Sequence, residues 1–173
     1  MKISLRPVGE INSHILEELR DRLSQVFGCP VEIKPGIDNV EQAYDPRRKQ
    51  YVSTILLGAL ETLDRENSEK ILGIADVDLY APGLNFVFGE ADSILDVAIV
   101  SLFRLRPQFY GRPPDETLFI NRAAKEMVHE LGHTFGLLHC SNPSCVMHFS
   151  NSLADTDIKE DTFCSNCRPR LRI

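Results

Sequence analysis

The sequence has 173 residues, of which 43% are hydrophobic and 25% are charged, and its formal net charge is −6. This composition is typical of a folded globular protein, and at this length we expect a single domain over residues 1–173. A negative net charge without clustered Lys or Arg argues against nucleic acid or an anionic membrane as a partner. The longest apolar run, at 97–103, is far shorter than the ~20 residues of a membrane span. Because no apolar leader begins the chain, we expect a cytoplasmic protein.

Strand-like and helix-like patterns alternate along the first three-quarters of the chain. Apolar residues that alternate with polar ones predict strands, whereas apolar residues spaced three and four apart predict helices. In chain order the expected elements are a strand over 2–8, a helix over 13–27, a strand over 31–33, a helix over 49–63, strands over 71–79, 84–89 and 97–105, and a long helix over 117–138.

The order of these elements predicts the topology. Strands joined through helices favour right-handed crossovers and a largely parallel sheet, but the link at Pro82-Gly83 is too short for a crossover helix. We therefore expect 84–89 to be an antiparallel edge strand. The predicted fold is α/β (α+β): a twisted, mixed, mostly parallel sheet of about five strands with three main helices. An N-terminal subdomain over 1–139 would be followed by a small loop-rich subdomain over 140–173, which lacks an apolar core of its own.

The long predicted helix carries two histidines that can share one metal ion. His129 and His133 are four residues apart, so both imidazoles project from one face of the helix toward a common point. This spacing is typical of zinc ligands. Glu130 follows the first histidine and is poorly placed to bind the same ion. It can instead hold the proton of a metal-bound water.

Gly136 predicts the end of this helix. A residue without Cβ adopts the left-handed conformation without steric cost, so the chain can turn back and bring His139 to the same ion. Three neutral imidazoles leave a tetrahedral zinc with one open position for water, as in catalytic sites. Any one of these histidines alone would be interpreted as an ordinary core or surface residue. The three histidines together predict a catalytic metal site.

The complete motif joins these residues to a later methionine: His129-Glu130-x-x-His133-x-x-Gly136-x-x-His139, then Met147. It resembles the metzincin clan of zinc peptidases, whose Met-turn lies under the metal site. The motif continues through four cysteines: Cys140-x4-Cys145-x-Met147-x16-Cys164-x-x-Cys167. This continuation is similar to the archaemetzincin (archaelysin) family, which is the resemblance we adopt.

The resemblance implies a role for each residue of the motif. The catalytic zinc would be bound by His129, His133 and His139. Glu130 would be the general base, and Met147 would supply the Met-turn. A second, structural zinc would be bound by Cys140, Cys145, Cys164 and Cys167. The chain would thus bind two Zn2+ and act on peptide or protein substrates.

The spacing of the cysteines supports the second site independently. Two close pairs, the second of them a C-x-x-C, are typical of a four-thiolate zinc site, which leaves no open coordination position. Its binding energy would fold residues 140–173. Two disulfides are the alternative, which a reducing compartment disfavours. Cys140 directly follows His139, so loss of the structural metal should disturb the catalytic one.

These residues together predict a zinc-dependent metalloprotease in which Glu130 activates a zinc-bound water and passes its proton to the leaving amine. Phe86, Val87 and Phe88 are expected to form the upper rim of the cleft, with the edge of the 84–89 strand offered to an extended peptide. The alternative is a zinc-stabilised peptide-binding module with a latent or inactive metal site. The motif does not distinguish an endopeptidase from an aminopeptidase.

The residues around the motif carry weaker signals. His148 is expected at the surface beside the Met-turn, with a position facing the cleft as the alternative. Cys29 is expected to be a small buried hydrophobe at the end of a helix. No tyrosine directly follows Met147, so the sequence locates no oxyanion stabiliser other than zinc. Nothing in the pattern demands more than a monomer.

Overall fold

A computed structural model describes residues 2–171, so residues 1, 172 and 173 of the expected domain lie outside it. Five strands form the main sheet, in the order β2-β1-β5-β8-β7. Their bounds are Lys2–Val8 for β1, Val31–Ile33 for β2, Glu69–Ala75 for β5, Gly89–Asp92 for β7 and Val97–Ser101 for β8. Neighbouring strands are parallel except β7, which pairs antiparallel with β8 at the edge of the sheet. The predicted mixed sheet with an antiparallel edge is confirmed.

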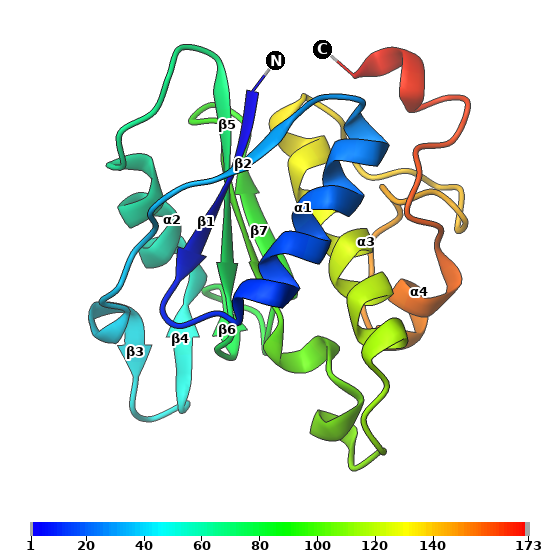
Figure 1. The fold of residues 1–173 in the computed structure, drawn as a ribbon. Coiled ribbons are helices and arrows are strands. Elements are labelled where there is room, and N and C mark those ends of the chain that lie inside the picture. Colours follow the sequence, from blue (N-terminus) through cyan, green and yellow to red (C-terminus); the bar gives the residue numbers. More distant parts are fainter. Residues whose placement is uncertain (1, 172–173) are drawn as a thin grey trace.

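Helices cover both faces of this sheet (Figure 1). The helices are α1 (Ser13–Phe27), α2 (Ser53–Glu61), α3 (Glu116–Thr134) and the short α4 (Leu153–Ile158). Strand β5 shows why both faces are apolar: Leu72 and Ile74 join a core with α1 and α3, whereas Ile71 and Ala75 join a second core with α2. The continuous apolar pattern of this strand thus comes from burial on both sides.

Helix α1 has the predicted bounds because its ends are determined locally. The Asn12 side chain caps the first turn by accepting hydrogen bonds from the N–H groups of His14 and Ile15. At the other end Gly28 adopts φ +67°, and its N–H bonds to the Ser24 carbonyl. Both capping residues are of types that favour these positions: Asn is favoured at the N-cap, and Gly is favoured where a helix ends in the left-handed conformation.

The predicted edge strand was misplaced by several residues. It runs over Gly89–Asp92, whereas residues 84–88 form an irregular segment beside it. Val87 and Phe88 each make one backbone hydrogen bond to a neighbouring strand region, to Leu79 and Ser101 respectively. The aromatic and apolar composition of 84–88 suggested a strand, but pairing with β8 decides which residues form it.

Three other element bounds were also wrong. The strand predicted over 71–79 divides, because β5 ends at Ala75 and β6 (Leu79–Tyr80) joins a second sheet. That second sheet also contains β3 (Tyr44–Asp45) and β4 (Gln50–Val52), so α2 begins at Ser53 and not near residue 49. The strand predicted over 97–105 ends at Ser101 and is followed by a 3-10 turn.

The C-terminal segment contains a helix that the sequence did not reveal. Ser152 and Asp155 form a reciprocal capping box that starts α4. Asp157 on this helix makes a bidentate ion pair with the buried Arg122 of α3, at 2.7 and 2.6 Å. The tail is therefore anchored to the long helix at this point. Within residues 2–171, no helix is both long and apolar enough to cross a membrane.

Candidate metal centres

Two of the three predicted histidines lie on the last two turns of α3, and their rings are held by backbone carbonyls. His129 Nδ1 lies 2.8 Å from the Val146 carbonyl oxygen, and His133 Nδ1 lies 2.8 Å from that of Leu137. Because a carbonyl only accepts hydrogen bonds, both Nδ1 atoms carry the proton and both Nε2 atoms are unprotonated. The two Nε2 atoms are 3.1 Å apart. Two lone pairs at this distance repel each other unless a cation lies between them.

The chain then turns back at Gly136, as predicted, though the helix ends at Thr134 and not at Leu138. Gly136 adopts φ +85°, and the N–H of Leu137 bonds to the Gly132 carbonyl in a Schellman arrangement. This turn brings the His139 ring to 5.3 and 4.9 Å from the rings of His129 and His133.

The three rings have the spacing that a tetrahedral metal ion requires. One nitrogen from each histidine lies within 4.8 Å of the others. Ligand nitrogens about 2.1 Å from a tetrahedral zinc lie about 3.4 Å apart, close to the observed Nε2–Nε2 distance. Burial lowers the pKa of His129 well below its ordinary value and lowers the pKa of His133 and His139 as well. All three rings are therefore neutral at pH 7, which is the form that binds metal.

Glu130 is buried between α3 and the edge strand β7. A Cβ built on Gly89 would lie 2.6 Å from Glu130 Cγ and 2.7 Å from its Oε1, so only glycine allows this approach. Burial raises the pKa of Glu130 well above its ordinary value, and the nearby carboxylates of Glu126 and Glu90 raise it further. A carboxyl group with a raised pKa retains a proton more readily than an ordinary one, which suits a group that takes up and releases a proton.

Met147, expected to supply the Met-turn, packs against Gly132 of α3. It is fully buried, and its carbonyl oxygen accepts a hydrogen bond from the Cys140 N–H at 2.9 Å. The preceding residue, Val146, provides the carbonyl that orients His129. This turn therefore contacts both predicted metal centres through main-chain groups.

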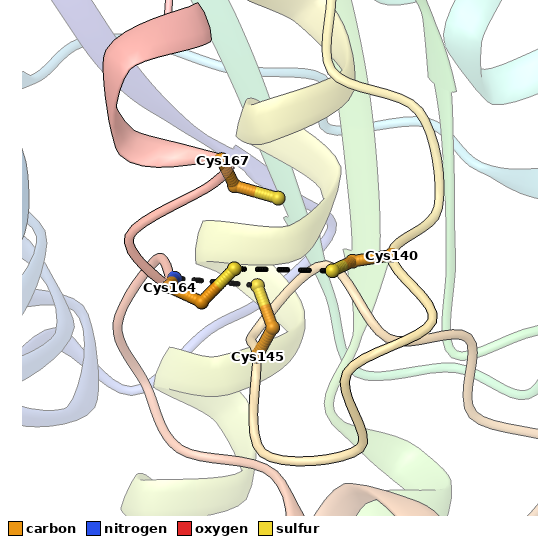
Figure 2. Close-up of side chains that lie close together, drawn as sticks. All are labelled: Cys140, Cys145, Cys164 and Cys167. Atoms are coloured by element: carbon orange, nitrogen blue, oxygen red, sulfur yellow. Dashed lines mark hydrogen bonds between the residues drawn. The ribbon is translucent and has the colours of Figure 1, made fainter.

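The four cysteines predicted to bind the second zinc lie close together, with their side chains pointing toward one another (Figure 2). Their sulfur atoms lie within 4.8 Å of one another, and all four are free thiols: Cys140, Cys145, Cys164 and Cys167. The Cys140 and Cys164 sulfurs are 3.9 Å apart. Sulfurs about 2.3 Å from a tetrahedral zinc lie about 3.8 Å apart, whereas a disulfide requires about 2.05 Å. The arrangement fits a four-thiolate site and not two disulfides.

The acidity of these thiols also fits a cation. Hydrogen bonds from the backbone N–H groups of Cys167 and Asn166 lower the pKa of Cys164 to about 6. Burial raises the pKa of Cys145 and Cys167 above the ordinary value. Without a positive ion the cluster can ionise one sulfur readily but not all four, so binding of a divalent metal would release protons.

The weaker predictions have mixed outcomes. His148 is half-buried, with its Nδ1 3.0 Å from the Cys140 carbonyl oxygen, so it faces the turn that joins the two centres. Cys29 packs against the main core but is only half-buried. Phe86 and Phe88 do line a hollow beside Glu130, although no strand carries them.

Sequence reasoning missed a buried ion pair next to the site. Glu126 on α3 lies 2.9 Å from the ammonium of Lys159, which follows α4, and both side chains are almost completely buried. Glu126 is four residues before Glu130, so helical spacing could have placed it on the same face. Nothing in the sequence signals Lys159, because its position depends on how the tail folds.

Comparison with known proteins identifies the family. A family model described as peptidase family M54 matches residues 9–173. The chain belongs to this peptidase family. It is 45% identical over 172 residues to the archaemetzincin of Methanocaldococcus jannaschii, covering 99% of this chain and 93% of that protein. The expected archaemetzincin relationship and the expected class of zinc metallopeptidase are thus confirmed.

Solved structures of M54 relatives share the fold. The zinc-dependent peptidase from Methanocorpusculum labreanum matches with a TM-score of 0.90 and 35% identity, covering 98% of this chain and 99% of that one. The archaemetzincin of Archaeoglobus fulgidus, crystallised with malonate, matches with a TM-score of 0.85 and 40% identity, again covering 98% and 99%. The architecture of this M54 chain is therefore that of its relatives over nearly the whole length.

Proposed function

We propose that the chain hydrolyses peptide bonds in peptide or protein substrates, with a catalytic zinc held by His129, His133 and His139. One observation carries the proposal: two unprotonated imidazole nitrogens face each other at 3.1 Å, and the buried Glu130 lines the same hollow as both histidines. A cation between the two nitrogens removes the repulsion of their lone pairs. A buried proton acceptor such as Glu130 has no evident structural purpose at this place.

The residues divide the chemistry between them. Zinc, when bound, supplies a Lewis acid that polarises the substrate carbonyl and acidifies water. Glu130 accepts the proton of the attacking water and donates it to the leaving amine. The raised pKa of Glu130 suits this double role, because the group must hold the proton between the two steps.

The substrate chain would lie along β7. This strand pairs only with β8 within residues 2–171, so its outer edge is free to hydrogen-bond an extended peptide. Glu90 and Ala91 on β7 line the same open hollow as the three histidines. A peptide bond held against this edge would therefore pass over the proposed metal site.

A second zinc, bound by the four cysteines, would hold residues 140–173 against α3. We propose that the whole chain acts as one catalytic domain, since the first cysteine of this cluster directly follows the third histidine. The cytoplasmic location and the monomeric state stay predictions from the sequence.

Metal content and turnover test this function. We expect two zinc ions per chain by elemental analysis, both retained in Glu130→Gln. Peptide hydrolysis should fall at least about 100-fold in this variant, the usual effect of losing a general base. Glu17→Gln, an exposed carboxylate on α1, is the matched control. Equal turnover in wild type and Glu130→Gln would contradict the proposed role. Peptide binding without cleavage by the zinc-loaded wild type would favour the peptide-binding module instead.

A further inference from the structure

A side pocket opens off the cleft next to Glu130. It encloses about 270 Å³ and lies between the segment 84–89, the end of α3 and residues 149–151. His129 and Glu130 line both this pocket and the open hollow over the histidines. A residue adjacent to the scissile bond can therefore place its side chain here, with room for one aromatic ring.

The walls of the pocket are aromatic and firmly supported. Phe86 and Phe88 pack edge to face with ring centroids 5.1 Å apart, and Phe149, two residues after Met147, also lines the pocket. The Arg104 guanidinium covers the Phe86 ring at 4.4 Å and is itself held by Asp78 in a bidentate pair at 2.6 and 2.8 Å. Flat apolar walls of this kind favour an aromatic side chain.

A buried carboxylate and a buried hydroxyl without a partner lie at the same pocket. Glu126 Oε1 accepts a hydrogen bond from the Thr156 hydroxyl at 2.8 Å and lies 2.9 Å from the Lys159 ammonium nitrogen. Glu126 itself lines the pocket. The Ser150 hydroxyl, from another lining residue, is buried and has no hydrogen-bond partner among the described residues. A buried hydroxyl without a partner is unfavourable, so Ser150 favours a ligand with a polar tip, and the Glu126 carboxylate can accept a hydrogen bond from such a tip.

The charges restrict what that tip can be. Glu126 is 2% exposed and Lys159 is 1% exposed, so the pair is neutral as a unit in a poorly solvated place. A Lys or Arg side chain would bring a second cation near the Lys159 ammonium, and an acidic side chain would face Glu126 and Glu130. An aliphatic residue or Phe would leave the Ser150 hydroxyl without a partner.

We propose that this pocket selects tyrosine at a position next to the scissile bond. The phenol ring would fill the space between the aromatic walls, while its hydroxyl donates to the Glu126 carboxylate and accepts from Ser150. The proposal rests on the function proposed above, and it adds the class of substrate: chains with tyrosine beside the cleaved bond.

Binding to an inactive protein tests the pocket without requiring turnover. Zinc-loaded Glu130→Gln is titrated with fluorescein-labelled hexapeptides of Ala and Gly that contain a single Tyr, Phe, Leu or Lys. We expect the Tyr peptide to bind most tightly, about ten-fold better than the Phe peptide, because one additional charge-assisted hydrogen bond contributes about this much. Equal binding of Tyr and Phe, tightest binding of Leu or Lys, or no binding of any peptide below about 1 mM would overturn the proposal.

Two further variants of the same protein assign the preference to its polar atoms. Ser150→Ala should lower the ratio of Tyr to Phe affinity to about three, with Ser24→Ala on α1 as the matched control. Replacing the buried pair by apolar residues, Glu126→Leu with Lys159→Met, should reduce the ratio to one, because apolar replacement of such a pair preserves folding. Thermal unfolding and zinc content check that both variants remain folded.

The outcomes separate this inference from the proposed function. A ratio of Tyr to Phe affinity that is unchanged in both variants would overturn the assignment of tyrosine selection to this pocket. Hydrolysis by the wild type without any preference for tyrosine would overturn it while leaving the proposed function intact. A clear tyrosine preference in binding, with no hydrolysis of the Tyr peptide by the zinc-loaded wild type, would support the pocket and contradict the proposed function.

Discussion

Gly132 of α3 lies directly against Met147: a Cβ on this glycine would be 2.4 Å from the methionine sulfur. The Met-turn can approach the helix this closely only because position 132 has no side chain. The contact lies between His129 and His133 along the helix, so it controls how far the turn is from the metal-binding face.

We predict that Gly132→Ala destabilises the protein, even though alanine normally favours a helix by about 0.5–1 kcal/mol over glycine. The new methyl group must push Met147 away and move the Val146 carbonyl that orients His129. Zinc affinity at the histidines should fall together with the melting temperature. Gly58→Ala in α2 is the control, because nothing lies within 4 Å of its added Cβ and alanine should stabilise there. A Gly132→Ala protein as stable as Gly58→Ala would refute the steric argument.

The adjacency of His139 and Cys140 predicts coupling between the two metal centres. Removing one thiolate in Cys164→Ser should release the structural metal, loosen residues 140–148 and lower zinc affinity at the histidines about 10- to 100-fold, as for loss of an orienting group. Competition with a chromogenic chelator measures this affinity. Cys29→Ser, outside the cluster, is expected to retain both metals. Unchanged affinity at the histidines after loss of the structural metal would show that the centres are independent.

The buried pair predicts a strongly non-additive stability effect. Lys159→Met alone leaves the Glu126 carboxylate buried without its cation, which should cost about 3–5 kcal/mol in the free energy of unfolding. Adding Glu126→Leu should recover most of this loss, because no buried charge then remains. Urea unfolding of the two variants measures the difference. If the double variant is as unstable as the single one, the pair contributes through packing and not through charge.

Acid should destabilise the protein partly through Glu69. Burial alone would raise the pKa of this carboxyl group, but hydrogen bonds from Ser4, from the Glu66 N–H and from Lys34 outweigh burial and lower the pKa to about 2. A folded-state pKa below the unfolded one stabilises the protein above about pH 4.5, and this contribution is lost as the pH falls toward 2. The ionised Glu69 carboxylate contributes at most about 3 kcal/mol to the free energy of unfolding.

Urea unfolding between pH 7 and pH 3 tests this effect in Glu69→Gln. The difference in the free energy of unfolding between wild type and variant should shrink as the pH falls below about 4.5. The wild type then loses the stabilisation from the ionised Glu69 carboxylate, which the variant lacks at every pH. Glu10→Gln, an exposed residue, serves as the control for general acid effects. A wild type–variant difference that stays constant to pH 3 would contradict the assignment.

What the sequence predicted well was specified locally. The end of helix α1 could be predicted from Gly28, and the histidine triad from helical spacing and the left-handed Gly136. What it could not predict depends on distant pairing. Gly89–Asp92 is a strand only because β8 lies beside it. Lys159 reaches Glu126 only because an ion pair to Arg122 fixes the tail.

The free edge of β7 has a consequence for solubility. An edge that can accept a peptide could equally pair with the edge of another copy and start aggregation. Strand β7 has only four residues, and two of them, Glu90 and Asp92, carry negative charge. Two such edges brought together would repel each other, whereas an uncharged peptide would not be repelled. The charges of β7 thus oppose pairing between two copies of the protein, whereas they do not oppose pairing with an uncharged peptide.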